Sequence, residues 1–157
     1  MDKPFSVLFV CLGNTCRSTM SEGIFNHLVK SKGLQDKWRI DSAGIENWHE
    51  GKPPDEFTIE MLERNNMLDG YCHTARQITE ADFMKFNFIL GMDLYNIRCL
   101  KRKAPPNYTA KLFFMHFMSL SRHHLKFLKN CMLNVSDAVK DFWRYKLIKF
   151  HKQKNRL

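Results

Sequence analysis

Blocks of apolar and polar residues follow one another along the chain with two different periods. Residues 5–10 (FSVLFV) form a short, nearly unbroken apolar run, typical of a strand that is buried on both faces. Residues 18–32 have apolar side chains at steps of three and four, which predicts a helix. Ser18 with Glu22 close behind it resembles a helix start, and Gly33 resembles a helix stop.

The rest of the first two thirds continues this alternation. The expected elements, in order, are a strand over 38–44 (WRIDSAG), a loop over 45–55 whose Asp55 caps a helix to about residue 65, a short helix opening at Thr79, a strand over 86–92, a helix from Asp93 to Pro105–Pro106 and a possible fourth strand at 109–114 (TAKLFF). Alternating strands and helices favour parallel β-α-β units with helices on both faces of one sheet. The pattern therefore predicts an α/β fold.

The end of the chain differs from this body in charge. Residues 113–157 hold ten Lys/Arg and two Asp, so they carry +8 of the net charge of +9. An apolar stripe at helical spacing runs through them: Leu125, Leu128, Met132, Val135, Val139 and Phe142. Three interpretations stay open: a C-terminal helix packed on the sheet, a basic amphipathic helix that touches membrane or RNA, and poor order.

Composition narrows the class of protein. A length of 157 residues, with 44% hydrophobic and 26% charged residues, fits one globular domain. The sequence contains no run of about 18 apolar residues, so no membrane span is expected. No secretory signal is expected at the N-terminus either. The five cysteines are scattered without a C-x-x-C pair, which disfavours a disulfide framework and a zinc site. We therefore expect a cytoplasmic protein without a metal.

The chemistry is expected between the first strand and the first helix. The apolar run stops at Cys11, and five residues then pass before Arg17 and Ser18, where the helical pattern begins. A loop at this place can turn successive backbone N–H groups inward, and with the helix N-terminus these donors bind a tetrahedral oxyanion. Arg17 can bind two phosphate oxygens at once, and a thiol held beside such positive groups is favoured as a nucleophilic thiolate. The alternative is a buried structural cysteine with a surface arginine.

The segment 10–18 (VCLGNTCRS) resembles the signature loop of the low-molecular-weight protein tyrosine phosphatases. The resemblance continues at 41–55 (DSAGIENWHEGKPPD), 73–79 (HTARQIT) and 88–96 (FILGMDLYN), and so covers about residues 5–112. It implies a four-stranded parallel twisted sheet with helices on both faces. We expect residues 1–157 to form a single phosphatase-like domain, with a family-like body at 1–112 and a divergent basic tail at 113–157.

The resemblance also implies roles for individual residues. Cys11 would be the nucleophile that forms a phosphocysteine, and Arg17 would bind the phosphoryl group and stabilise the transition state. Asn14 would hold the loop in shape, Ser18 would donate a hydrogen bond to the Cys11 thiolate, and Ser42 would brace Asn14.

The implied substrate-binding residues are those of the loop and its rim: Leu12, Gly13, Asn14, Thr15, Cys16, Ser18 and Trp48. Trp48 would offer an aromatic wall to a phosphotyrosine ring, and Cys16 could trap an oxidised Cys11 as a reversible disulfide. His73 is interpreted as a packing histidine and Asp93 as a helix cap. Thr15 and Thr19 depart from the family, which usually has an aliphatic residue and a proline there.

The general acid of the family is not found in the sequence. The family takes this proton from an aspartate in a D-P-Y-type loop near the C-terminus, and no Asp precedes a Pro in 113–157. Asp137 and Asp141 are the only acids there, so the general acid is unknown. One hypothesis is that the C-terminal third is read out of frame. Shifted codons compatible with 134–143 permit C-L-R-C-C-K-G-F-L, which resembles the family's terminal helix, but no shift over 113–125 restores Asp-Pro.

These observations predict cysteine-dependent hydrolysis of phosphotyrosine and other aryl phosphomonoesters, without a cofactor. One alternative is a weak or inactive phosphate-binding relative. Another is an arsenate reductase, which would need thiols in relay, whereas Cys72, Cys99 and Cys131 show no such spacing. The expected partners are phosphotyrosine proteins or small aryl phosphates. No nucleic acid is expected, although the basic tail leaves that open, and the sequence does not indicate an oligomeric state.

Overall fold

Four parallel strands form the central sheet of the computed structural model, which describes residues 4–115. In chain order they are β1 (Phe5–Cys11), β2 (Trp38–Gly44), β3 (Phe88–Gly91) and β4 (Lys111–Phe114), and their order in the sheet is β2-β1-β3-β4. β1 lies between two neighbours: Val7 is in register with Ile40 of β2 and with Phe88 of β3. This central position explains why the 5–10 run is apolar almost throughout.

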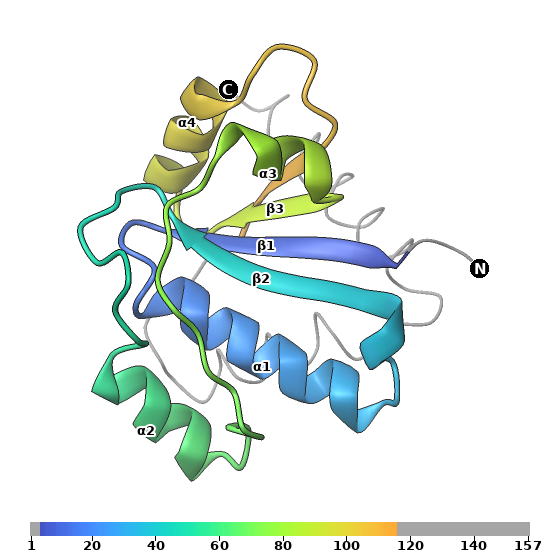
Figure 1. Cartoon of the computed structure of the whole chain (residues 1–157), viewed down its shortest axis with the longest axis vertical. Helices are drawn as coiled ribbons and strands as arrows, with labels where there is room; N and C mark the ends of the chain where they lie inside the picture. Colours follow the sequence, from blue (N-terminus) through green and yellow to red (C-terminus); the bar gives the residue numbers. More distant parts are fainter. Residues whose placement is uncertain (1–3, 116–157) are drawn as a thin grey trace, which may run out of the picture. The chain divides into compact units, whose positions relative to one another are not determined.

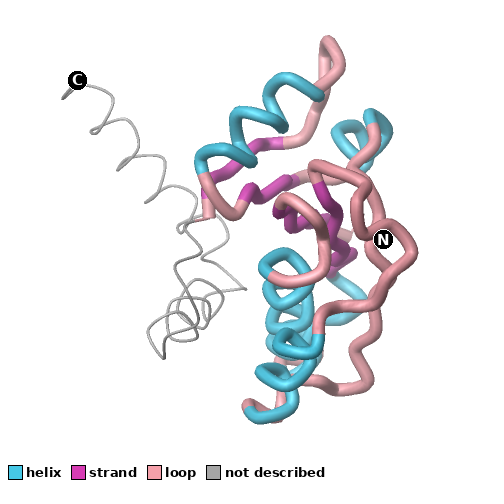
Figure 2. Tube along the Cα trace, turned by 90° about the vertical axis from the view of Figure 1, so that its left-hand side faces the viewer, coloured by secondary structure: helices cyan, strands magenta, loops and turns pink. Residues whose placement is uncertain are grey.

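Helices cover both faces of this sheet, as expected (Figure 1). They are α1 (Arg17–Ser31), α2 (Glu56–Arg64), α3 (Glu80–Lys85) and α4 (Leu94–Lys103), with a 3-10 turn, η1 (Gln35–Lys37), before β2. Figure 2 shows the strands, in magenta, between two groups of helices. The fold class predicted from the sequence is confirmed for the described residues.

The two faces of β1 pack against different helices because successive side chains of a strand point to opposite sides. Phe9 faces α1, where its ring lies 5.7 Å from that of Phe25. Leu8 and Val10 belong to the opposite core, with Phe83 of α3 and Leu100 of α4. Leu8, Val10 and Leu100 are fully buried, so both ends of the Cys11–Arg17 segment are attached to well-packed elements.

Most helix boundaries follow the predicted signals. The Asp55 side chain caps α2 by accepting a hydrogen bond from the Thr58 N–H at 2.7 Å. Thr79 opens α3 through a capping box with Asp82. Gly33 has φ +64°, a left-handed conformation that suits glycine after a helix end.

The predicted capping of α1 by Ser18 and Glu22 is wrong, although the helix starts within one residue of its expected position. The helix begins at Arg17 after Cys16, and no side chain caps it. Ser18 and Glu22 are buried and make tertiary contacts instead: Ser18 Oγ lies 3.0 Å from Cys11 Sγ, and Glu22 accepts from Ser42 Oγ at 2.6 Å. Two residues that resemble a capping pair thus make tertiary hydrogen bonds, which their spacing in the sequence does not indicate.

The interpretations of the tail fall mainly outside the described residues. The apolar stripe over 125–142, the acids Asp137 and Asp141 and the out-of-frame hypothesis all lie in that part of the chain. Within residues 4–115, no helix is both long and apolar enough to cross a membrane.

The parallel arrangement brings three loops to one edge of the sheet. β1 ends at Cys11, β2 is followed by the 45–55 loop, and β3 is followed by Asp93, the first residue before α4. Carboxyl ends of parallel strands meet at the same edge, where α/β proteins bind their ligands. The chemistry of the chain is therefore to be sought there.

Candidate active site

The loop between β1 and α1 closes around the sulfur of Cys11. The Cys11 residue is only 3% exposed. Its Sγ accepts a hydrogen bond from the Asn14 backbone N–H at 3.2 Å and lies 3.0 Å from Ser18 Oγ. One backbone N–H of the loop and one hydroxyl from the first turn of α1 thus contact the sulfur. We call residues 11–17 the nucleophile loop, after the role that the sequence resemblance implies for Cys11.

Asn14 holds this loop through all four hydrogen-bonding positions of its side-chain amide. Its Nδ2 donates to Ser18 Oγ at 3.0 Å and to Ser42 Oγ at 2.9 Å. Its Oδ1 accepts from the Arg76 backbone N–H at 2.9 Å and lies 2.9 Å from His73 Nε2. Asn14 is fully buried and has φ +60°, a conformation that asparagine tolerates better than most residues. The sharp turn of the loop is therefore fixed from α1, β2 and the 73–76 segment.

A second layer of buried and half-buried polar groups supports Asn14. Ser42 Oγ donates to Glu22 Oε2 at 2.6 Å, the Tyr71 hydroxyl donates to the same oxygen at 2.9 Å, and His73 Nδ1 lies 3.2 Å from it. Burial raises the pKa of Glu22 to about 7 and lowers the pKa of His73. Burial, followed by the nearby Glu22 charge, also raises the pKa of Tyr71. The His73 side chain is hydrogen-bonded and only 7% exposed, in agreement with its interpretation as a packing residue.

Arg17 is held by an acid from another loop. Its Nη1 lies 2.6 Å from Asp93 Oδ2, and both side chains are about one third exposed. Asp93 also caps α4, since its Oδ1 accepts from the Asn96 N–H at 2.6 Å. The cap was predicted correctly, whereas the ion pair with Arg17 was not. Asp93 thereby ties the direction of the guanidinium to the end of β3.

The loop after β2 forms one wall of the site. The Ile45 and Glu46 N–H groups donate to the Cys11 and Leu12 carbonyls, both at 2.9 Å. His49 lies so close to Gly13 that a Cβ at Gly13 would be 2.7 Å from His49 Cδ2. Trp48 is 64% exposed in the same loop, a position that leaves its ring available to a bound molecule.

The start of α2 forms another wall. The Asp55 N–H donates to the Thr15 carbonyl at 2.9 Å, and Thr58 Oγ1 lies 3.4 Å from the carbonyls of Thr15 and Cys16. Burial and the neighbouring Asp55 raise the pKa of the Cys16 thiol to about 11. Cys16 is therefore protonated at neutral pH and is a poor nucleophile. The Thr19 hydroxyl donates to the Cys16 carbonyl at 2.8 Å, which satisfies an acceptor at the helix start.

Several backbone donors of the loop lack an acceptor within residues 4–115. They are the N–H groups of Leu12, Gly13, Thr15, Cys16 and Arg17, whereas that of Asn14 binds the Cys11 sulfur. Backbone donors in folded proteins are almost always satisfied by protein or water. A set of open donors beside a thiol and a guanidinium has the character of an anion site.

The described residues also include one group with the donor types of a metal site. Ligand atoms of Glu22, Asp41 and His73 lie within 4.8 Å of one another. Both ring nitrogens of His73 already have partners, Glu22 and Asn14. A bound cation would have to displace at least one of these contacts, so hydrogen bonding accounts better for the cluster.

Sequence reasoning missed several residues of the site. Glu22 was interpreted as part of a helix start, His49 was not considered, and Arg76 was noted only within the 73–79 segment. These residues contact the nucleophile loop or its supports across the tertiary structure, and no local spacing signals such contacts. The quoted family-like segments contain His49 and Arg76, and that was the only available signal.

The fold and the loop together define an α/β protein with a buried cysteine and an arginine on one loop at the carboxyl edge of a parallel sheet. The family model described as low molecular weight phosphotyrosine protein phosphatase matches residues 6–130. The chain belongs to this family. The match extends beyond residue 112, where the resemblance seen in the sequence ended.

Individual relatives agree with this assignment. The chain is 46% identical over 110 residues to low molecular weight phosphotyrosine protein phosphatase 2 of Drosophila melanogaster, covering 70% of this chain and 66% of the relative. It is 51% identical over 100 residues to the low molecular weight protein-tyrosine-phosphatase YfkJ of Bacillus subtilis, covering 63% of each. The crystal structure of DARP, a Drosophila arginine phosphatase, has a TM-score of 0.62 and 38% identity over 69% of both chains. The matched region thus spans less than two thirds of the two sequence relatives.

Proposed function

We propose that the protein hydrolyses phosphomonoesters, phosphotyrosine above all, through a phosphocysteine intermediate. The Cys11 thiolate attacks phosphorus, an S–P bond forms, and the P–O bond to the leaving phenolate breaks. Water then attacks phosphorus, the S–P bond breaks, and inorganic phosphate leaves. No step needs a metal or an organic cofactor.

Each part of the nucleophile loop has a role in this proposal. Arg17 and the open N–H groups bind the phosphoryl oxygens, whose charge grows towards the transition state. Ser18 and the Asn14 N–H stabilise the sulfur both as attacking thiolate and as leaving group. Ser42 braces Asn14, and Trp48 contacts the aromatic ring of the substrate.

One observation carries the proposal: the contacts of the Cys11 sulfur. The sulfur is bound by the Asn14 N–H at 3.2 Å and adjoins Ser18 Oγ at 3.0 Å, inside a loop with open backbone donors and an arginine at its end. A structural cysteine would pack against apolar groups and would have no use for these donors.

Two versions of the proposal differ in whether the chain has an acid that protonates the leaving group. A positioned acid contributes about 10²–10⁴ in rate, and residues 113–157 hold two acids, Asp137 and Asp141, of which Asp137 is tested below. Without an acid the chain would be a slow or inactive phosphate-binding relative.

The deciding experiment is p-nitrophenyl phosphate hydrolysis by the full chain, Cys11→Ser and Asp137→Ala. We expect steady turnover that Cys11→Ser abolishes. A burst equal to one nitrophenolate per protein, without turnover, would favour the binding protein. Loss of turnover in Asp137→Ala, with the burst retained, would assign Asp137 to the second step.

A second candidate substrate is phosphoarginine. It is favoured by the likeness to DARP, which is named as an arginine phosphatase. Comparing kcat/KM for a phosphotyrosine peptide and a phosphoarginine peptide of the same sequence distinguishes the two. A higher value for the phosphotyrosine peptide supports our proposal.

We further propose a cytoplasmic location and phosphorylated proteins as partners. The four cysteines of residues 4–115 are all free thiols, which fits a reducing compartment. A catalytic thiol would also remain reduced there.

A further inference from the structure

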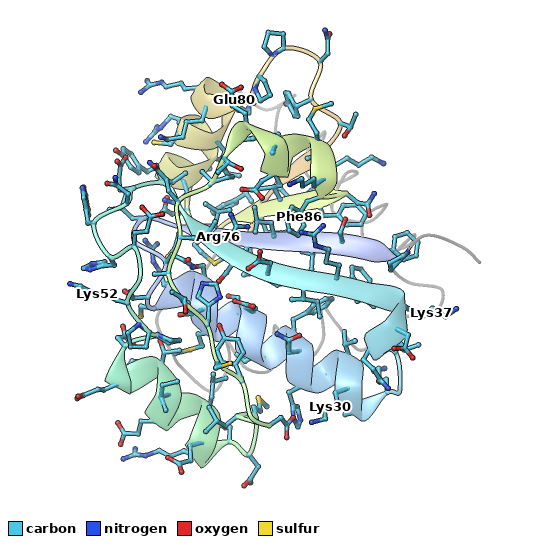
Figure 3. All side chains as sticks on the ribbon, in the orientation of Figure 1. Lys30, Lys37, Lys52, Arg76, Glu80 and Phe86 are labelled. Carbon is cyan, nitrogen blue, oxygen red and sulfur yellow. The ribbon has the colours of Figure 1, made fainter. Side chains whose placement is uncertain are left out.

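A cluster of three charged residues lies behind the nucleophile loop. The Arg76 guanidinium lies between two acids: Asp41 of β2, whose Oδ2 is 2.8 Å from Nη2, and Asp82 of α3, whose oxygens are 2.9 Å from Nη1 and 3.2 Å from Nη2. Nε adds a contact of 3.3 Å to Asp41. All five hydrogen-bonding directions of an arginine are fixed in one plane, so these contacts set both position and orientation. Figure 3 labels Arg76 at the carboxyl edge of the sheet.

The charges of the cluster support one another. Burial alone would lower the pKa of Arg76, but its hydrogen bonds to Asp82 and the charge of Asp41 outweigh this and raise the pKa. Burial would likewise raise the pKa of Asp82, whereas the Arg76 hydrogen bond lowers it. These contacts therefore favour the charged forms of Arg76 and Asp82.

The backbone of Arg76 is the point where this cluster meets the site. Its N–H donates to Asn14 Oδ1 at 2.9 Å, and its carbonyl accepts from the Gly44 N–H at 2.8 Å. Asp41 is the neighbour of Ser42, which contacts the opposite end of the same Asn14 amide. The side chain of Arg76 thus contacts β2 and α3, while its backbone N–H contacts Asn14. The N–H of Asn14 in turn binds the Cys11 sulfur.

We propose that Arg76 is a positioning residue, whose guanidinium is clamped between Asp41 and Asp82 so that its backbone N–H holds Asn14 and keeps the Asn14 N–H against the Cys11 sulfur. The inference rests on the proposed role of Cys11 as nucleophile. Arg76 itself contacts no substrate in this arrangement. Its effect passes through Asn14 to the contact between the Asn14 N–H and the Cys11 sulfur.

The test compares Arg76→Gln, Arg76→Lys and the control Arg64→Gln. Arg64 is exposed on α2 and pairs with Glu60, so its replacement removes the same charge away from the site. The first readout is the pH dependence of Cys11 alkylation by iodoacetamide, followed by peptide mass spectrometry, which needs no turnover. The second is the split of kcat and KM for p-nitrophenyl phosphate.

We expect the alkylation midpoint of Arg76→Gln to move upward by about 0.5–1 pH unit, because part of a hydrogen bond to a charged sulfur is lost. The value of kcat should fall several-fold, with a smaller change in KM. Arg76→Lys should recover part of the shift, since it keeps the charge but not the planar two-sided contact. Arg64→Gln should leave both readouts unchanged.

A folded Arg76→Gln with an unchanged alkylation midpoint would overturn the proposal, whether or not its activity falls. Should that variant fail to fold, Asp82→Asn weakens the clamp more gently and must move the midpoint in the same direction. A shifted midpoint in a protein without any phosphatase activity would retain the positioning role and reject the proposed function instead.

Discussion

Gly13 shows at the level of a single residue how closely the nucleophile loop is packed. Its φ is not left-handed, so backbone strain does not require glycine there. The reason is steric: a Cβ would meet His49 at 2.7 Å. The loop after β2 can approach the nucleophile loop only because this position has no side chain.

Gly13→Ala is therefore expected to push His49 and its loop away from the site. Affinity for vanadate should fall several-fold, because the open N–H groups no longer converge. The double variant Gly13→Ala/His49→Ala should recover most of it, which isothermal titration would show. Equal losses in the single and double variants would contradict the steric explanation.

Glu22 is the second residue whose environment has a measurable effect, here on the pH dependence of folding stability. Its pKa of about 7 in the folded protein exceeds its ordinary value of 4.5, because burial disfavours the charged carboxylate. Between these two pH values the folded state binds the proton more tightly than the unfolded state. Stability arising from Glu22 is therefore present at low pH and lost as pH rises towards about 7.

Wild type should lose stability relative to Glu22→Gln between about pH 4.5 and pH 7, with little further change above pH 7. Each pKa unit corresponds to about 1.4 kcal/mol, so the relative loss is up to about 3 kcal/mol. Urea unfolding of both proteins at pH 5, 6, 7 and 8 measures this difference in unfolding free energy. Because both proteins contain His73, whose lowered pKa changes stability with pH in the opposite direction, the comparison cancels that contribution. A difference that does not change with pH would show that Glu22 is charged throughout.

At the level of elements, the N-terminus of α2 links stability to the loop. Asp55 caps the helix with its side chain, while its backbone N–H supports Thr15. The two functions use different atoms, so a substitution can separate them. The same carboxylate also lies beside the Cys16 thiol and raises its pKa.

Asp55→Ala should cost about 1 kcal/mol in unfolding free energy, the usual effect of a lost N-cap. It should also make Cys16 react faster with iodoacetamide at pH 9, because a neighbouring negative charge is gone. Burial still acts on the thiol, so Cys16 remains slower than an exposed cysteine. Asp55→Asn, which keeps the cap, should change the reactivity without the full loss of stability.

At the level of the whole molecule, the proposed anion site would couple ligand binding to folding. The open donors come from a loop that is formed only when β1, β2 and α1 are packed together. A dianion that binds the folded state alone stabilises it by about 2.7 kcal/mol at a concentration one hundred times its Kd.

Phosphate should therefore raise the Tm of the full chain in a concentration-dependent way, measured by calorimetry. Arg17→Ala should remove most of this rise, because the guanidinium supplies the fork that binds two oxygens. Arg64→Ala serves as the control for a lost positive charge. An equal rise in wild type and Arg17→Ala would place the bound phosphate elsewhere.

The sequence by itself determined those features that depend on near neighbours in the chain. The central strand is an apolar run, the caps Asp55 and Thr79 stand directly before their helices, and Gly33 follows α1. Cys11 and Arg17 lie on a single loop, so their spacing already indicated an oxyanion site. Such signals are local because hydrogen bonds within a helix start or a tight loop join residues a few positions apart.

Only the tertiary structure decided what holds the loop in place. Asn14 meets Ser42, His73 and Arg76 across 28, 59 and 62 positions of the chain. Arg17 meets Asp93 across 76 positions. These partners come together because parallel strands align their carboxyl ends at one edge of the sheet. Ser18 and Glu22 were misinterpreted for the same reason, since burial against distant residues outweighed their local capping preference.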